Sequence, residues 1–266
     1  MAKRRTSRTS RETPRPSKTG LHLFRIPGIP EIRCGENLAK CISDSAHAAG
    51  LPFENGDILV IAQKIVSKAE GAFVRLTTVT PSPKALGIAA RLKKDPRVME
   101  IVLRESRRIV RSHHVLIAET RHGFVCANAG VDHSNVPGDE VVTLLPRDPD
   151  RSAKKLAAAL RKRTGKRLAV IISDTFGRPW RLGLTNVAIG AAGLPVLLDL
   201  RGTCDRHGKP LTATILAVAD ELAAAAGLLM GKSEGMPVVL IRGYRYKAKS
   251  EPAARIIRPA AEDLFR

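Results

Sequence analysis

Two separate stretches of the sequence carry side chains that could hold a metal ion beside a phosphorylated substrate. In one of them, the apolar run 168–172 is followed by Ser173, Asp174 and Thr175. A short β-branched run of this kind predicts a buried strand, and ligands of α/β proteins bind beyond the carboxyl ends of strands. A carboxylate beside hydroxyl groups at that position favours a hard cation such as Mg²⁺ or Mn²⁺.

Arg178 and Arg181 follow in the same predicted loop. A guanidinium group binds phosphate or carboxylate through paired hydrogen bonds, so either arginine could clamp an anionic substrate. A strand, a turn that begins at an aspartate, and solvated arginines would explain the same residues. This stretch alone does not decide between the two interpretations.

The second stretch, residues 128–138, offers Asp132, His133 and Asn135 within eleven residues. Asx turns would account for its Asn and Asp residues without any function. His133 is expected to be a surface histidine, because no second His or Cys lies at metal-binding spacing. Lys68 follows another predicted strand, 58–62, where it could neutralise a phosphate or remain a solvated lysine.

Together, two acidic loops and nearby cations form the minimum set for metal-assisted phosphoryl transfer. The sequence contains no Walker A motif, no G-x-G-x-x-G and no G-x-S-x-G. Any nucleotide site must therefore be of an unusual kind.

The periodicity of apolar residues predicts a mixed α/β (α+β) fold. Helices are predicted at 35–50, 82–92, 96–110, 150–163, 184–192 and 212–230. Strands are predicted at 58–62, 115–118, 124–127, 141–145, 168–172, 196–199 and 237–241.

The chain has 266 residues, of which 44% are hydrophobic and 26% charged, as expected for a soluble globular protein. It contains no apolar run near the roughly 20 residues of a membrane span and no signal peptide, so we expect a cytoplasmic protein without a membrane partner. Its four cysteines are scattered, which predicts reduced thiols rather than a disulfide framework.

The net charge of +20 is partly concentrated at the N-terminus, where residues 1–19 hold seven Lys or Arg against one Glu. We therefore expect a disordered basic tail at 1–21, a folded unit at 22–244 made of one domain or two intertwined subdomains, and a basic C-terminal tail at 245–266. The positive charge of the folded unit suits polyanions, either nucleic acids or nucleotides and polycarboxylates. An aromatic content of 3% and the paired acidic loops both disfavour nucleic acid.

Five longer runs make the pattern specific: GIPEI at 28–32, GDILVIAQKIVSKAEG at 56–71, AGVDHSNV at 129–136, ISDTFGRPWRLGLTNVAIGAAG at 172–193 and VADELAAAAGLLMGK at 218–232. In this order they resemble the coenzyme F420 gamma-glutamyl ligase family, over residues 22–243. The resemblance implies a family-specific α/β fold and an intertwined homodimer. It also implies a GTP-dependent ligase that adds L-glutamate to the deazaflavin acceptor F420-0 and then to its gamma-glutamyl tail.

The resemblance further implies roles for individual residues. Divalent-metal ligands are implied at Asp132, Asp174 and Thr175, for one or two Mg²⁺ or Mn²⁺ ions, with K⁺ as a further cation. GTP contacts are implied at Ile29, Pro30, Glu31, Ile32, Gln63, Lys68 and Asn135. Lys68 and Arg178 are the candidates for neutralising the transferred phosphoryl group, Arg178 from its loop position alone. Lys232 stands where some relatives have a metal-binding Gln, which puts the ligands of a second metal in doubt because an ammonium cannot ligate a cation.

An amine does not displace a carboxylate oxygen at neutral pH, so the acceptor carboxylate must first become an acyl phosphate. The GTP and metal motifs do not identify the acceptor, and a pterin or folate carrying glutamate is an alternative to the deazaflavin. A basic nucleic-acid-binding protein is the alternative from another functional class.

Overall fold

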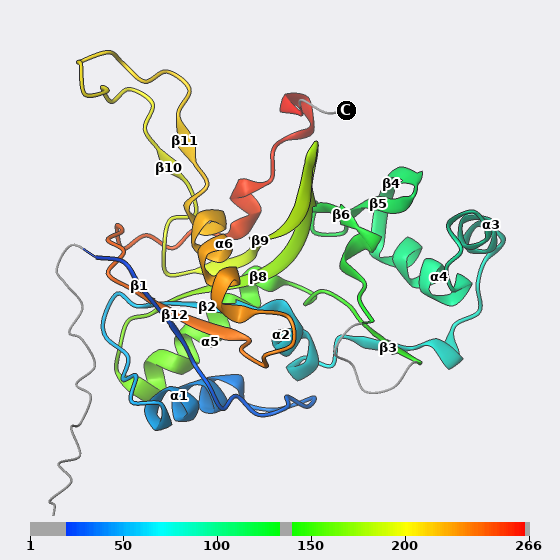
Figure 1. Cartoon of the computed structure of the whole chain (residues 1–266), viewed down its shortest axis with the longest axis horizontal. Coiled ribbons are helices and arrows are strands. Elements are labelled where there is room, and N and C mark those ends of the chain that lie inside the picture. Colours follow the sequence, from blue (N-terminus) through cyan, green and yellow to red (C-terminus); the bar gives the residue numbers. More distant parts are fainter. Residues whose placement is uncertain (1–19, 134–139, 264–266) are drawn as a thin grey trace, which may run out of the picture.

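The centre of the molecule is a five-stranded sheet in the order β1-β12-β2-β8-β9 (Figure 1). The computed structural model describes residues 20–133 and 140–263. The strands of this sheet are β1 (His22–Arg25), β2 (Ile58–Ala62), β8 (Ala169–Arg178), β9 (Arg181–Ala192) and β12 (Val238–Arg242). β2 and β8 run parallel, whereas the other neighbouring strands in this sheet are antiparallel.

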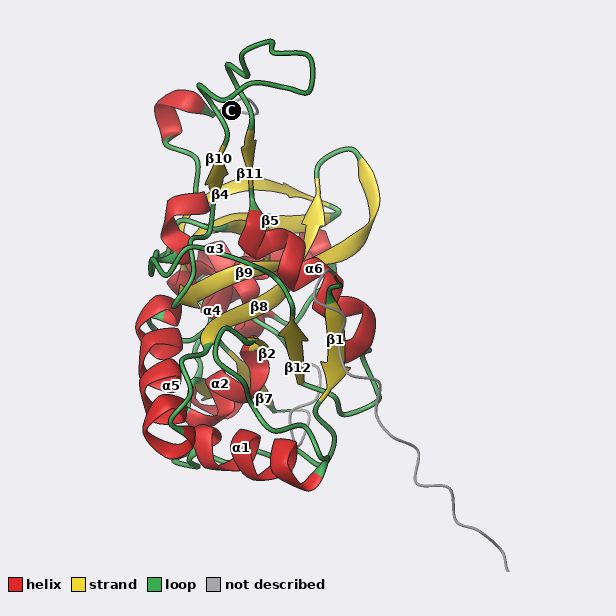
Figure 2. Cartoon of the chain, turned by 90° about the vertical axis from the view of Figure 1, so that its left-hand side faces the viewer, coloured by secondary structure: helices red, strands yellow, loops and turns green. Residues whose placement is uncertain are grey.

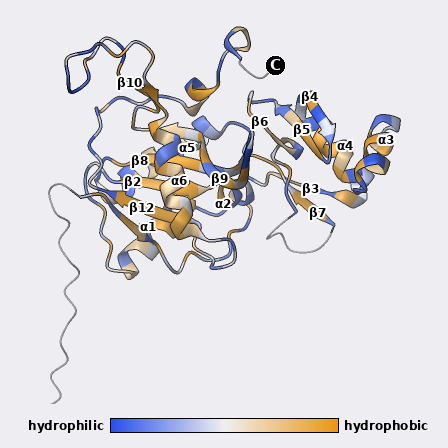
Figure 3. Cartoon of the chain, turned by 45° about the horizontal axis from the view of Figure 1, so that its top comes forward, coloured by the Kyte–Doolittle hydropathy of each residue, from blue (hydrophilic) through white to orange (hydrophobic). Residues whose placement is uncertain are grey.

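Helices cover both faces of this sheet, which explains why β2 and the first half of β8 are continuous apolar runs. On one face lie α1 (Leu38–Ala48) and α5 (Pro149–Thr164), and on the other lies α6 (Val218–Met230) (Figure 2). Alternate residues of β8 enter the two cores, with Val170 and Ile172 in one and Ala169 and Ile171 in the other. Figure 3 shows hydrophobic residues along the central strands and α6.

Residues between β2 and α5 build a second packed unit with its own apolar core. After α2 (Gln63–Ala69) come β3 (Phe73–Arg75), α3 (Pro83–Leu92), α4 (Pro96–Glu105), β4 (Ser106–His113), β5 (Val115–Thr120), β6 (Val125–Ala127) and β7 (Val141–Thr143). β4, β5 and β6 form an antiparallel sheet, and β3 pairs with β7. The short strands β10 (Leu198–Asp199) and β11 (Ile215–Leu216) pair at the base of a projecting loop (Figure 1).

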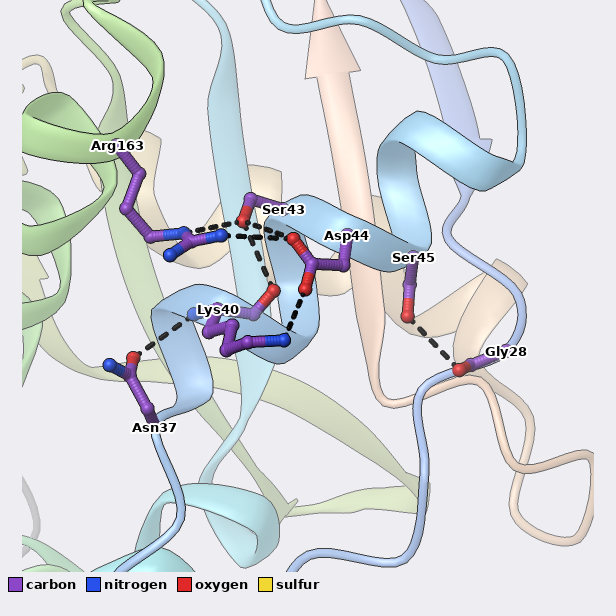
Figure 4. Close-up of polar contacts among 7 residues, drawn as sticks. All are labelled: Gly28, Asn37, Lys40, Ser43, Asp44, Ser45 and Arg163. Carbon is purple, nitrogen blue, oxygen red and sulfur yellow. Dashed lines mark hydrogen bonds and ion pairs between the residues drawn. The ribbon is translucent and has the colours of Figure 1, made fainter.

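Helix α1 fixes the start of the loop 29–32, which lines a cavity. The hydroxyl of Ser45 donates a hydrogen bond to the carbonyl of Gly28 at 3.0 Å, and the guanidinium of Arg163 on α5 donates to Asp44 at 3.0 Å (Figure 4). The loop is therefore tied through α1 to the main core.

The mixed α/β fold is confirmed, as are the predicted strand 58–62, the helix 82–92 and the hairpin 115–127. The helix predicted at 184–192 is wrong, because these residues form β9 and pair with β8. Partner-strand pairing and burial have overridden the helix propensity of this Ala-containing segment. The helix predicted at 96–110 ends at Glu105, where the chain turns into β4, and the helix predicted at 212–230 begins only at Val218.

The helix predicted at 150–163 begins at Pro149 as α5, and Asp148 caps it by accepting a hydrogen bond from the Arg151 backbone N–H. The carboxylate of Asp150 accepts from the backbone N–H groups of Ala191 and Ala253. This link fastens part of the basic C-terminal segment to β9. No helix in the described ranges has the length and apolar character needed to cross a membrane.

Candidate functional site

A cavity of about 830 Å³ opens where the parallel pairing of β2 with β8 ends. Ala62 at the end of β2 is in register with Ser173 of β8, and α2 begins directly after Ala62. Polar residues that follow the two strands are thereby brought to one place. The cavity is lined by five segments: the loop 29–32, the start of α2, Asp132, residues 173–175 with 184–186, and the region from Ala224 to Pro237.

Asp132 and Asp174 both line this cavity although they lie in different segments of the chain. The backbone of Asp132 is fixed by two hydrogen bonds with Thr143, of 3.0 and 2.8 Å. Its carboxylate forms a 2.6 Å ion pair with the ammonium of Lys64, whose side chain is 17% exposed. The two acidic stretches identified in the sequence therefore meet, and Lys64 lies with them. The prediction that Asp174 lies in a loop is wrong, because β8 continues to Arg178 and Asp174 pairs with Val187 of β9.

Burial raises the pKa of the Asp174 carboxyl from 3.8 to about 6. The nearby carboxylate of Asp132 raises this pKa further, whereas Lys232 and Lys64 act in the opposite direction. A carboxyl with a pKa close to neutrality loses its proton readily when a cation arrives. Perturbation by burial together with a like charge is typical of functional sites.

Two hydroxyl groups complete the set of oxygen atoms. Thr175 Oγ1 lies 3.2 Å from Asn186 Oδ1 and accepts a hydrogen bond from Lys232 Nζ at 2.8 Å. The hydroxyl of Ser173, which is 2% exposed, has no hydrogen-bond partner within the described part of the chain. A buried polar atom left without a partner beside two carboxylates indicates a ligand or an ordered water there.

The residues present fit a hard divalent cation, because all of these donors are oxygen atoms. Within the described ranges, 20–133 and 140–263, no group of three or more His, Cys, Asp or Glu side chains is placed to hold a metal. The protein would therefore supply two carboxylates and neighbouring hydroxyls, and water or substrate oxygens would supply the remaining ligands.

Lys68 lies at the junction of this cavity with a side pocket of about 550 Å³. Its ammonium forms a 2.5 Å ion pair with Glu31, which is exposed, while the Lys68 side chain itself is only 12% exposed. A buried cation that is held by a solvent-facing carboxylate can exchange that partner for an incoming phosphate. The side pocket also has apolar walls, formed by Ile32, Phe73 and Val141.

The structure brings together most of the residues predicted from the sequence. Those that line the cavity are Ile29, Pro30, Glu31, Ile32, Gln63, Lys68, Asp132, Asp174 and Thr175. Arg178 does not line it, since the predicted loop is the tip of the β8–β9 hairpin, where Arg178 donates to the carbonyl of Leu182. Asn135 lies outside the described residues.

Sequence reasoning missed Lys64 and Asn186 as residues of the site. Lys64 belongs to the same polar run as Lys68, directly after the predicted strand 58–62. That position could have identified Lys64 as a site residue. Cys126 lies near Asp174 but is not a candidate nucleophile, because burial raises the pKa of its thiol to about 12.

Comparison with known proteins identifies the family of this chain. The family model described as F420-0:Gamma-glutamyl ligase matches residues 28–243. The chain belongs to this family. The resemblance noted in the sequence is confirmed, and every residue that lines the cavity falls inside the match.

Relatives in the F420-0:gamma-glutamyl ligase family match over almost their whole length. The Coenzyme F420:L-glutamate ligase of Methanothermobacter thermautotrophicus is 49% identical over 93% of this chain and 99% of its own. The Coenzyme F420:L-glutamate ligase of Methanopyrus kandleri is 47% identical over the same shares. The protein of that name from Methanocaldococcus jannaschii is 43% identical over 90% of this chain and 94% of its own.

The raised pKa of Asp174 predicts a characteristic pH dependence of stability in the metal-free protein. Because the folded protein holds the Asp174 proton more tightly than the unfolded chain, this residue's contribution to the free energy of unfolding falls as pH rises from about 4 to 6. Asp174→Asn should therefore raise the melting temperature of metal-free protein at pH 7, by the equivalent of about 1–3 kcal/mol. Thermal unfolding in EDTA at pH 4 and pH 7 measures the effect.

The matched control is Asp44→Asn, because the side-chain hydrogen bond from Lys40 lowers the pKa of Asp44. That substitution should leave stability unchanged or lower it at pH 7. A melting temperature of Asp174→Asn at pH 7 that is equal to or below that of the wild type would contradict the presence of a destabilising buried charge at Asp174.

Proposed function

We propose that this protein is a ligase that joins L-glutamate to coenzyme F420-0 and then to the growing gamma-glutamyl tail, with GTP as the energy source. The observation that carries the proposal is the meeting of Asp132, Asp174 and Lys68 around one cavity, in a chain whose relatives are named Coenzyme F420:L-glutamate ligase. Each of these residues suits phosphate chemistry, and none is needed to complete an apolar core.

The reaction follows from the inertness of a carboxylate toward amines. An oxygen of the acceptor carboxylate attacks the γ-phosphorus of GTP, the bond to the β-phosphate oxygen breaks, and GDP leaves. The amine of glutamate then attacks the carbonyl carbon of the acyl phosphate, loses a proton, and expels inorganic phosphate. Both substrates are polyanions, which gives the basic folded unit a role without nucleic acid.

Lys68 is the residue in this chain that we assign to the transferred phosphoryl group. Its ammonium is largely buried at the point where the cavity meets the side pocket, so a nucleotide could extend from one into the other. The apolar walls at Ile32, Phe73 and Val141 suit the base, and the polar cavity suits the phosphates and the acceptor carboxylate.

Asp132 and Asp174 would hold Mg²⁺ or Mn²⁺, which when bound neutralises charge on phosphate oxygens. The remaining contribution of the chain is positional. The loop 29–32 is tied to α1, and α2 is fixed directly to β2, so the groups that face the nucleotide lie on rigid elements.

We also propose that two copies of the chain form a homodimer through the β8–β9 hairpin. Its tip projects from the body of the molecule (Figure 1) and carries Trp180, Leu182 and Leu184, which are 83%, 99% and 64% exposed. Leu228 on α6 is also largely exposed. Exposed apolar residues gathered on a projecting element are typical of a protein interface.

Acyl-phosphate formation can be tested with hydroxylamine in place of glutamate. GDP release should depend on the acceptor, and an acyl hydroxamate of F420-0 should accumulate. Lys68→Ala should lower hydroxamate and amide formation together by about 100-fold or more, because both pass through the same first step. Folate and pterin acceptors run in parallel identify the acceptor class.

The control for Lys68→Ala is Lys84→Ala, an exposed lysine on α3 outside the cavity lining, which should keep normal activity. Normal amide formation without acceptor-dependent GDP or hydroxamate would rule out the acyl-phosphate route. Absence of glutamate ligation with every acceptor would reject the ligase itself.

The homodimer predicts that a charge at the hairpin tip weakens self-association. Leu182→Glu should shift the mass measured by light scattering after gel filtration from dimer to monomer, because an ionised side chain would be buried at the interface. Leu86→Glu is the matched control, since Leu86 is an exposed leucine on α3. A monomeric wild type, or a dimer unaffected by Leu182→Glu, would reject this interface.

A further inference from the structure

We propose that each cavity holds a single divalent ion and that the ammonium of Lys232 takes the place of a second cation beside Thr175. The inference rests on the proposed function, because it concerns the metal that would assist phosphoryl transfer. Under this inference the site contains one metal ion and the ammonium of Lys232, instead of two metal ions.

The first observation is the position of Lys232. It follows the end of α6, and its Nζ donates to Thr175 Oγ1 at 2.8 Å, which joins two elements across the cavity. The Thr175 hydroxyl in turn lies within hydrogen-bond distance of Asn186 Oδ1. A hydroxyl oxygen that already accepts from an ammonium has its outward lone pair directed at a positive charge, where a second cation would be repelled.

The second observation is the balance of charge. Among the described residues that line the cavity, three carboxylates face three ammonium groups: Glu31, Asp132 and Asp174 against Lys64, Lys68 and Lys232. Glu31 is paired with Lys68, and Asp132 is paired with Lys64. One divalent ion would give this lining an excess of two positive charges, which suits a polyanionic substrate, whereas two ions would double the excess with no further carboxylate to offset it.

The third observation is the chemistry of the Lys232 side chain, which lines the cavity together with Asp174 and contacts Thr175. Lys232 is thus a positioning residue that occupies the Thr175 side of the cavity. An ammonium offers no lone pair and cannot itself ligate a metal, whereas an amide of similar length offers a carbonyl oxygen.

The test counts Mn²⁺ ions bound to the full-length protein with saturating GDP, from the electron paramagnetic resonance signal of free Mn²⁺ during titration. Wild type and the charge-conserving Lys232→Arg should each bind one ion per chain. Lys232→Gln should bind two, because the ammonium is replaced by a neutral oxygen ligand. Lys84→Gln on α3 is the control for loss of a positive charge elsewhere and should bind one.

Two tightly bound ions in the wild type, or one ion in Lys232→Gln whose melting curve shows that it is folded, would overturn this inference and leave the ligase proposal intact. No bound Mn²⁺ in any variant would overturn both this inference and the metal assignment. The rise from one ion to two in a protein that fails the ligation assay would support the site while rejecting the proposed reaction.

Discussion

The parallel pairing of β2 with β8 is the constraint on which the rest of the site depends. Each strand is an apolar run buried on both faces, and the register places Ala62 opposite Ser173. The polar residues just beyond this paired segment, on both strands, therefore lie close together. A slip of one residue would send Asp174 to the opposite face, away from Asp132.

The charges at this edge of the sheet lower the stability of the fold, because two carboxylates lie near each other and one of them is buried. Asp174 is placed where burial opposes its charge, and Asp132 is nearby with the same sign. Lys64 and Lys232 reduce the cost without removing it. If the site holds the proposed cation, binding would relieve this repulsion, so part of the folding stability would be exchanged for affinity.

The sequence predicted the parts of the site that follow local patterns. The buried strands and the two acidic stretches around Asp132 and Asp174 could be identified from apolar runs and residue types. The hairpin beyond Thr175 could not, because β9 is rich in small residues and its strand form depends on pairing with β8. For the same reason Arg178, predicted near the phosphate, lies at an exposed hairpin tip. The ion pair between Lys64 and Asp132 joins residues 68 positions apart, a distance over which local pattern carries no information.

The central claim is that Asp132 and Asp174 jointly hold a divalent ion where the segment at Asp132 meets β8. A crystal of the protein soaked with Mn²⁺ and GDP tests it directly, through an anomalous difference map recorded above the manganese absorption edge. We predict a peak about 2.1 Å from a carboxylate oxygen of each aspartate, with the Lys64 ammonium displaced from the Asp132 oxygen it now contacts. The absence of a peak between the two carboxylates, with the ion pair of Lys64 and Asp132 intact and GDP bound, would contradict the account.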